Sequence, residues 1–147
     1  MKYNTVHPFF FKKDINFIFK EFRKILSGSG LLSMGKFVKL FEKEFSIYNK
    51  SKYVVLTSSG TGALEIILRS LDIKKGDEII VPCQTFIGTV SPVINIGAKP
   101  IFAEIDENFL LDEEELNKLI TKKTKAVILV HYCGLIHKNI FNIKKFL

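Results

Sequence analysis

The chain has little of several residues that mark common protein classes. Among its 147 residues there is no Trp and there are only two Cys, Cys83 and Cys133. The two cysteines form no CxxC pair, and no group of His and Cys has the spacing of a zinc site. We therefore expect reduced thiols and no metal ligands. No apolar run approaches the roughly 18 residues of a membrane span, and the N-terminus lacks a signal-peptide pattern. These absences predict a cytoplasmic protein with no membrane partner.

Arginine is also scarce. Of the 22 basic residues only Arg23 and Arg69 are arginine, and the lysines are spread along the chain. Proteins that bind nucleic acid tightly usually cluster their positive charge and favour arginine. The net charge of +7 therefore indicates a solvated, lysine-rich surface and no nucleic-acid partner.

Apolar residues are plentiful, and their pattern predicts an α/β fold. They make up 47% of the chain, and 14 of them are Phe. Short apolar runs predict strands at 53–57, 78–81, 100–105 and 126–130, and the last is typical of a central parallel strand. Helical patterns of about ten residues lie between these runs, although Pro92 interrupts the one at 87–96. This alternation predicts βαβ units and a mainly parallel sheet flanked by helices.

The stretch from Ser58 to Leu64 is the most informative part of the chain. It joins a predicted strand to a predicted helix, and Ser58 or Ser59 can cap that helix. Gly60 and Gly62 allow a ligand to come close to the backbone, because they have no Cβ. The first amides of a helix lack partners within the helix, so this turn can bind a phosphate. The alternative is a capped helix without a ligand.

Two further segments are expected at the same edge of the sheet as this turn. They are residues 83–86 and 131–134, and both follow predicted strands. Ligands of parallel α/β sheets bind beyond the carboxyl ends of the strands. The expected meeting of these three segments favours a ligand site at this edge of the sheet. This inference rests on the fold class alone and not on particular side chains.

Six pieces of the sequence, in order, resemble one known family. They are "GKFVKLFEKEF", "SSGTGALEIIL", "GDEIIVPCQTFIGT", "GAKPIFAEID", "ITKKTKAVILVH" and Gly134. Over roughly residues 25–140 the chain resembles the N-terminal part of the DegT/DnrJ/EryC1/StrS family of sugar aminotransferases, which depend on pyridoxal 5'-phosphate (PLP). The resemblance implies a type I aminotransferase-like large domain, incomplete here. It also implies that residues 1–147 are the N-terminal part of the PLP-binding large domain, without its remainder or the small C-terminal domain.

The resemblance also implies roles for individual residues. Gly60 and Thr61 would hold the cofactor phosphate through backbone amides and the Thr hydroxyl. Phe86 would stack on the pyridine ring, and its alternative role is that of an ordinary core aromatic. Thr89 lies where the family often has a hydroxyl-bearing residue, and its alternative role is to cap a helix or to pack in the core. We assign no catalytic role to His131.

Two further acidic residues, Glu104 and Asp106, resemble a recurrent pair of the family, and we expect them to be structural turn residues. The segments Cys83-Gln84 and Tyr132-Cys133 depart from the commonest family choices, as does Pro92. These departures put the substrate preference in doubt more than the fold.

The family's chemistry needs two groups that this resemblance places beyond Leu147. One is the lysine that holds the cofactor covalently, and the other is the aspartate that pairs with the ring nitrogen. None of the lysines of this chain has such a setting. We therefore expect a chain that is inactive alone and contains no catalytic residue of its own.

The implied reaction moves an amino group from glutamate to a nucleotide-linked keto-sugar, in amino-sugar synthesis for surface polysaccharide. The family resemblance implies a homodimer at full length. Three alternatives stay open: a dehydratase member of the same family, a non-catalytic module that binds a phosphorylated ligand, and a subunit completed by a separately encoded half.

Overall fold

A computed structural model describes residues 8–137 of the chain. The chain divides into two compact units, residues 1–56 and residues 57–147. Within the described residues, no helix is long and apolar enough to cross a membrane.

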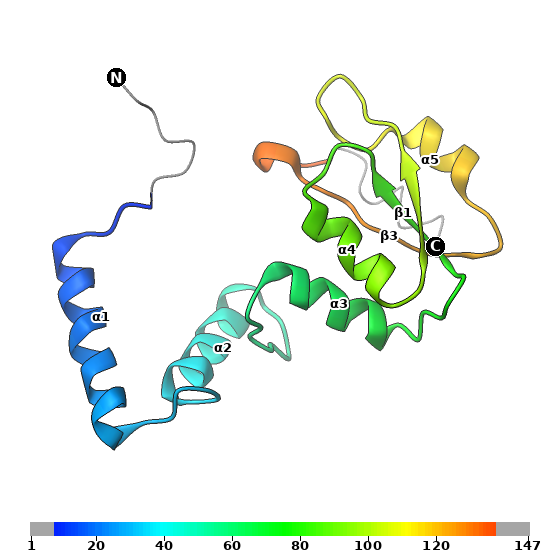
Figure 1. The fold of residues 1–147 in the computed structure, drawn as a ribbon. Helices are drawn as coiled ribbons and strands as arrows, with labels where there is room; N and C mark the ends of the chain where they lie inside the picture. Colours follow the sequence, from blue (N-terminus) through cyan, green and yellow to red (C-terminus); the bar gives the residue numbers. More distant parts are fainter. Residues whose placement is uncertain (1–7, 138–147) are drawn as a thin grey trace. The chain divides into compact units, whose positions relative to one another are not determined.

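The described residues of the first unit form helices joined by loops. Its elements are α1 (Lys12–Lys24), the π-helical turn η1 (Ile25–Ser29) and α2 (Lys36–Tyr48) (Figure 1). Helix α1 has Asp14 in its first turn and basic residues in its last turn, which suits the helix dipole at both ends. On α2, the rings of Phe41 and Phe45 stack with their centroids 5.5 Å apart, because residues four apart share a helix face.

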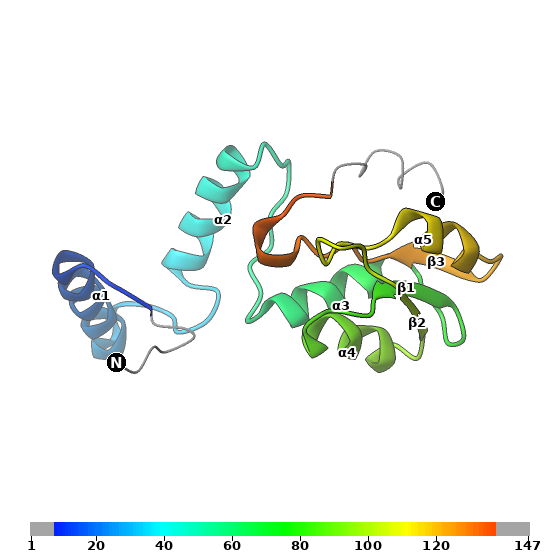
Figure 2. The same cartoon turned by 90° about the horizontal axis from the view of Figure 1, so that it is seen from above.

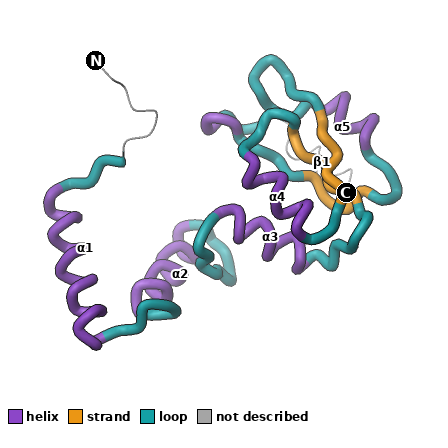
Figure 3. The backbone as a smooth tube through the Cα atoms, viewed as in Figure 1, coloured by secondary structure: helices purple, strands orange, loops and turns teal. Residues whose placement is uncertain are grey.

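The strand predicted at residues 53–57 is not formed. This segment is drawn as loop between α2 and α3 in Figure 3, and no described residue pairs with it. The amide of Leu56 donates instead to the carboxylate of Glu42, at 2.9 Å. A β-prone sequence forms a strand only where another strand offers its backbone groups, and local sequence does not specify that neighbour.

The second unit contains a three-stranded parallel sheet in the order β2-β1-β3. Its strands are β1 (Glu78–Pro82), β2 (Lys99–Ala103) and β3 (Thr124–Val127). Ile80 of β1 is in register with Ile101 on one side and Val127 on the other. The prediction of a central strand at 126–130 was wrong for the described residues, because β1 is central there and β3 is an edge strand. A continuous apolar run indicates burial on both faces, but it does not fix the order of strands.

Helices cover both faces of this sheet. Helices α3 (Gly60–Ser70) and α4 (Ile87–Asn95) lie on one face, and α5 (Glu113–Leu119) lies on the other (Figure 2). Successive residues of β1 point to opposite faces, so Ile79 packs with the α3 and α4 side and Ile80 with the α5 side. Both are fully buried. The predicted α/β class is therefore confirmed.

Two local predictions have clear outcomes. Asp112 caps α5 as expected, and its Oδ1 accepts from the amides of Glu114 and Glu115 at 2.8 and 3.1 Å. Helix α4 continues through the buried Pro92. The proline ring has no N–H to donate, so the helix loses one hydrogen bond there without ending.

Candidate functional site

The turn between Thr57 and Gly62 forms the N-terminal end of α3. Ser59 is the cap, and its hydroxyl accepts from the amide of Gly62 at 3.1 Å. Its carbonyl accepts from the amide of Ala63 at 3.0 Å. In the described part of the chain, the amides of Gly60 and Thr61 donate to no acceptor. This end of α3 therefore offers two amide donors, and the helix dipole favours an anion there.

Thr61 and Phe86 lie against the same glycine, Gly88. A Cβ atom built on Gly88 would lie 2.5 Å from the Thr61 hydroxyl oxygen and 2.7 Å from a ring carbon of Phe86. Real Cβ atoms essentially never come that close to other atoms. Gly88 is buried near the start of α4, whereas Thr61 is in the first turn of α3. The fold thus brings the predicted phosphate ligand and the predicted ring platform together.

Phe86 is the cap residue of α4, and its backbone is extended (φ −71°, ψ 141°). Its side chain is 76% exposed. The structure therefore does not support the alternative role of Phe86 as a core aromatic. An exposed aromatic face beside a helix N-terminus can stack on a flat ring.

Two threonines flank Phe86 and are joined to each other. The hydroxyl of Thr85 donates to the hydroxyl of Thr89 at 2.9 Å. The amide of Thr89 also donates to the Phe86 carbonyl at 2.8 Å. Thr89 is 8% exposed. The amide of Thr89 therefore closes the first turn of α4, and its buried hydroxyl packs there and accepts from Thr85.

Helices α3 and α4 are also joined by a charged residue. Glu65 accepts from Arg69 on its own helix at 2.8 Å, and it accepts from Asn95 of α4 at 3.2 Å. The hydrogen bond from Arg69, followed by the one from Asn95, lowers the pKa of the Glu65 carboxyl below its ordinary 4.5. This link joins the two helices at whose N-terminal ends Thr61 and Phe86 lie.

Cys83 follows β1 directly. Its amide donates to the Ala103 carbonyl at 2.8 Å, and its thiol lies 3.7 Å from a carboxylate oxygen of Glu104. Both cysteines of the chain, Cys83 and Cys133, are exposed and form no disulfide.

His131 lies after β3 and is exposed, in the turn that leads to η2 (Tyr132–Gly134). Its Nδ1 accepts from the backbone amide of His137 at 3.4 Å. This contact gives His131 a structural partner.

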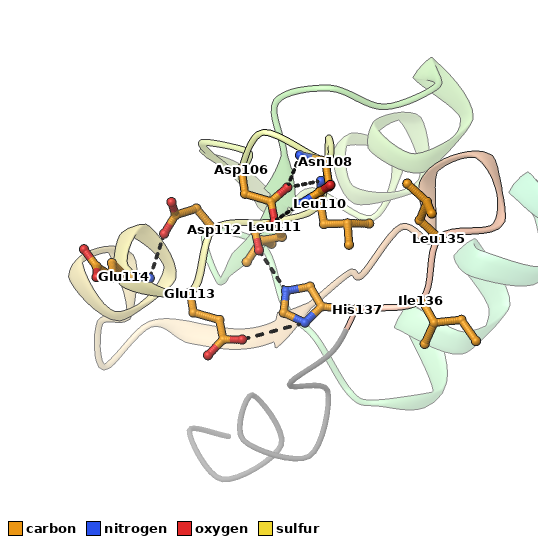
Figure 4. A pocket seen from close by; sticks show the side chains of 10 residues that line it. All are labelled: Asp106, Asn108, Leu110, Leu111, Asp112, Glu113, Glu114, Leu135, Ile136 and His137. Atoms are coloured by element: carbon orange, nitrogen blue, oxygen red, sulfur yellow. Dashed lines mark hydrogen bonds and ion pairs between the residues drawn. The ribbon is translucent and has the colours of Figure 1, made fainter.

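A cavity lies elsewhere in the second unit, around His137 (Figure 4). It has a volume of about 430 Å³, and its lining residues include Asp106, Glu113 and Leu135. The ring of His137 is buried, with Nε2 2.8 Å from the Leu111 carbonyl oxygen and Nδ1 3.8 Å from the Glu113 carboxylate. None of Gly60, Thr61 and Phe86 lines this cavity.

Asp106 organises the turn beside that cavity. Its carboxylate accepts from the amides of Asn108 and Leu110 at 2.8 and 2.9 Å. The hydrogen bond from Leu110 is the main cause that lowers the pKa of Asp106 below its ordinary value. Asp106 is therefore a structural turn residue, as predicted.

The residues of the α3 and α4 turns fit the cofactor that the sequence implies. A phosphate needs amide and hydroxyl donors that are not already used, and Gly60 and Thr61 offer them. A pyridine ring needs a flat apolar surface within reach of that phosphate, and Phe86 offers one beside the same Gly88. We noticed these three residues in the sequence but missed Gly88. The signal was present, because an isolated glycine inside a helical pattern often marks a close approach.

The chain is similar in sequence to several known sugar-modifying proteins. GDP-perosamine synthase of Vibrio cholerae is 42% identical over 103 residues, which are 69% of this chain and 28% of that protein. The spore coat polysaccharide biosynthesis protein SpsC of Bacillus subtilis is 44% identical over 72% of this chain and 28% of its own length. The 3-oxo-glucose-6-phosphate:glutamate aminotransferase of Bacillus subtilis is 36% identical over 72% of this chain and 24% of its own length. The matches thus span only 24 to 28% of the length of these relatives.

Solved structures give the same result for the fold. Spr1654 of Streptococcus pneumoniae, known in a PLP form and a PMP form, has a TM-score of 0.84 and 30% identity. That match covers 95% of this chain and 34% of Spr1654. A GDP-4-keto-6-deoxymannose-3-dehydratase has a TM-score of 0.75 and 32% identity, over 87% of this chain and 34% of its own. These neighbours confirm the aminotransferase-like fold and PLP as the cofactor of the family.

The model of one protein family covers most of the chain. It is described as the DegT/DnrJ/EryC1/StrS aminotransferase family, and it matches residues 12–146. This is the family whose motifs the sequence resembles. The chain belongs to the DegT/DnrJ/EryC1/StrS aminotransferase family.

Proposed function

We propose that residues 57–103 form the phosphate and ring contacts of the PLP site in an aminotransferase of nucleotide-linked keto-sugars. Glutamate is the amino donor in this proposal, and the product is an amino sugar for surface polysaccharide. The working unit is a cytoplasmic homodimer of the complete protein, and residues 1–147 are the N-terminal part of its PLP-binding large domain. The catalytic lysine and the aspartate at the ring nitrogen belong to the same large domain, outside the 147 residues.

The residues of this chain bind and orient the cofactor. The amides of Gly60 and Thr61 and the Thr61 hydroxyl donate to the phosphate, at the positive end of α3. Phe86 covers one face of the pyridine ring and fixes its tilt without competing for its protons. PLP, when bound, withdraws electrons from the carbon that carries the amino group.

The observation that carries this proposal is the shared contact at Gly88. A phosphate turn alone is common to many capped helices, and an exposed Phe alone has many roles. Here the Thr61 hydroxyl and the Phe86 ring lie against one glycine that has no room for a Cβ. A ligand held by both must contain a phosphate and a flat ring, which is the chemistry of PLP.

The substrate class rests on the relatives. One makes a GDP-linked sugar, another acts in spore coat polysaccharide synthesis, and a third is named for a glutamate-dependent reaction. Each name supports one part of the proposal: the first the nucleotide-linked sugar, the second the surface polysaccharide, and the third glutamate as the amino donor.

A second function is favoured by one neighbour, the GDP-4-keto-6-deoxymannose-3-dehydratase. Removal of a sugar hydroxyl by this second reaction uses the same cofactor contacts. The two reactions differ in the group that moves the proton, and the 147 residues do not include it in this proposal.

The test uses the protein expressed from its natural gene and loaded with PLP. Incubation with glutamate is expected to release 2-oxoglutarate and to convert the bound cofactor to its amine form. A GDP- or dTDP-linked 4-keto-6-deoxy sugar should then receive the amino group, which mass spectrometry of the product detects.

The other outcomes of this test are equally informative. A product that has lost a hydroxyl and gained no nitrogen would establish the dehydratase. Binding of inorganic phosphate without any affinity for PLP would overturn the proposal in favour of a phosphate-binding module. Activity that appears only after co-expression with a second gene would establish a split enzyme.

A further inference from the structure

The ring of Phe86 has few side-chain neighbours to hold it. It is 76% exposed, and it belongs to the cap residue of α4 rather than to the helix itself. Core packing, which fixes most aromatic rings, therefore contributes little here. A side chain that stacks on a ligand must nevertheless keep one orientation, because ordering it on binding would lower the affinity. The orientation of this ring must therefore come from its backbone and from its contact with Gly88.

Two hydrogen bonds connect the backbone on the two sides of Phe86. Thr85, just before it, donates from its hydroxyl to the hydroxyl of Thr89 at 2.9 Å. Thr89 in turn donates from its amide to the Phe86 carbonyl at 2.8 Å. The two bonds connect the residue before the ring, the ring residue and the first turn of α4.

The burial of Thr89 makes this arrangement rigid. Thr89 is 8% exposed, and it lies on a helix whose neighbouring residues Gly88 and Val90 are also buried. A hydroxyl fixed in this way provides a stationary acceptor for Thr85, which is only half-buried. Each hydrogen bond of this kind has a modest net effect, but it limits the backbone angles that Phe86 can adopt.

We propose that Thr85 and Thr89 are positioning residues that hold the Phe86 ring in its stacking orientation through their hydroxyl–hydroxyl bond. Neither touches the cofactor in this proposal, and both act through Phe86. The inference rests on the proposed function, because it assumes that Phe86 stacks on the ring of the cofactor.

The test measures the affinity of the protein, expressed from its natural gene, for pyridoxamine 5'-phosphate. This form has no aldehyde, so it does not react with the many surface lysines. Binding is followed by the fluorescence of the pyridoxamine ring. Thr89→Val keeps the shape of the side chain but removes the hydroxyl, and we expect its affinity to fall about two- to tenfold, as for one lost hydrogen bond. Thr89→Ser keeps the hydroxyl and should restore most of the affinity.

Two controls accompany these variants. Thr85→Val removes the other partner, so it should lower the affinity by a similar factor, and it serves if Thr89→Val does not fold. Ser91→Ala removes a hydroxyl from the same helix that donates to the Ile87 carbonyl. It should leave the affinity within about twofold, since this hydroxyl belongs to neither Thr85 nor Thr89.

A double-mutant cycle with Phe86→Ala identifies the route of the effect. If Thr89 acts through the ring, Thr89→Val should cause no further loss of affinity in the Phe86→Ala background. Equal losses in both backgrounds would overturn the inference and give Thr89 a role that does not depend on the ring. An unchanged affinity of Thr89→Val and Thr85→Val would overturn it as well.

The failure of the inference can be told apart from failure of the proposed function. If Phe86→Ala itself leaves the affinity unchanged, Phe86 does not stack and the proposed site is wrong. If Phe86→Ala weakens binding but the threonine variants behave additively with it, the site is right and only the positioning role is wrong.

Discussion

Asn95 on α4 donates a hydrogen bond to Glu65 on α3, with 3.2 Å between the amide nitrogen and the carboxylate oxygen. The same carboxylate accepts from Arg69, so it is held from two directions. Because α3 begins with the proposed phosphate contacts and α4 begins after Phe86, this bond connects the two halves of the proposed cofactor site.

This bond predicts a pH-dependent stability. The pKa of Glu65 is lowered in the folded chain, first by Arg69 and then by Asn95. The stabilisation is therefore complete above the ordinary pKa of 4.5 and is lost as the pH falls through the lowered folded-state pKa. Glu65→Gln should lower the free energy of unfolding near neutral pH, and its difference from the wild type should shrink as the pH falls.

Urea unfolding at several pH values checks this prediction. Glu107→Gln, a change at an exposed carboxylate in the same unit, is the matched control. A difference between the wild type and Glu65→Gln that stays constant from neutral pH to about pH 3 would contradict the assigned cause.

The space around Gly88 predicts a second effect. Even the first atom of a side chain there would lie 2.5 Å from the Thr61 hydroxyl oxygen. Gly88→Val should therefore displace Thr61 or Phe86, and we expect the affinity for pyridoxamine 5'-phosphate to fall about five- to 150-fold, as for overpacking of roughly 1–3 kcal/mol. Ser91→Val, on the same helix, is the control for introducing a β-branched side chain. If Gly88→Val bound the cofactor as well as the control does, the close approach would have no functional importance.

The Thr61 hydroxyl predicts a third effect, which concerns the phosphate. Thr61→Val should weaken binding of pyridoxamine 5'-phosphate about ten- to a hundredfold, the range for a hydrogen bond to a charged group. Thr61→Ser should retain most of the affinity. Competition by inorganic phosphate should weaken in parallel, because the lost contact is to the phosphate and not to the ring.

Fluorescence titration of each variant makes the measurement. Thr121→Val is a suitable control, because its hydroxyl donates to Glu78 at 2.6 Å, far along the chain from the proposed phosphate contacts. Equal affinities of Thr61→Val and the wild type would remove Thr61 from the site.

Local features of the fold were predictable from the sequence. Ser59 caps α3 and Asp112 caps α5, because a short polar side chain before a helical pattern satisfies the free amides of the first turn. The strands at 78–81 and 100–105 were found for a similar reason, since short apolar runs between turn residues are typical of buried parallel strands.

Features that depend on distant neighbours were not predictable. Residues 53–57 have the composition of a strand but pair with no strand among the described residues, and β3 proved to be an edge strand. The site shows the same limit. The turn itself indicated Gly60, and a family resemblance assigned Thr61 and Phe86. The approach of Gly88 to Thr61 involves residues 27 positions apart and follows only from the three-dimensional structure. The Thr85–Thr89 bond also depends on how α4 begins, which the sequence left open because of Pro92.

The most direct test of the central claim is a crystal structure of the protein with pyridoxamine 5'-phosphate bound. We expect the phosphate within hydrogen-bond distance of the Gly60 and Thr61 amides and of the Thr61 hydroxyl, with the pyridine ring stacked on Phe86. A phosphate bound away from the N-terminus of α3, or a ring that does not contact Phe86, would contradict the proposed site.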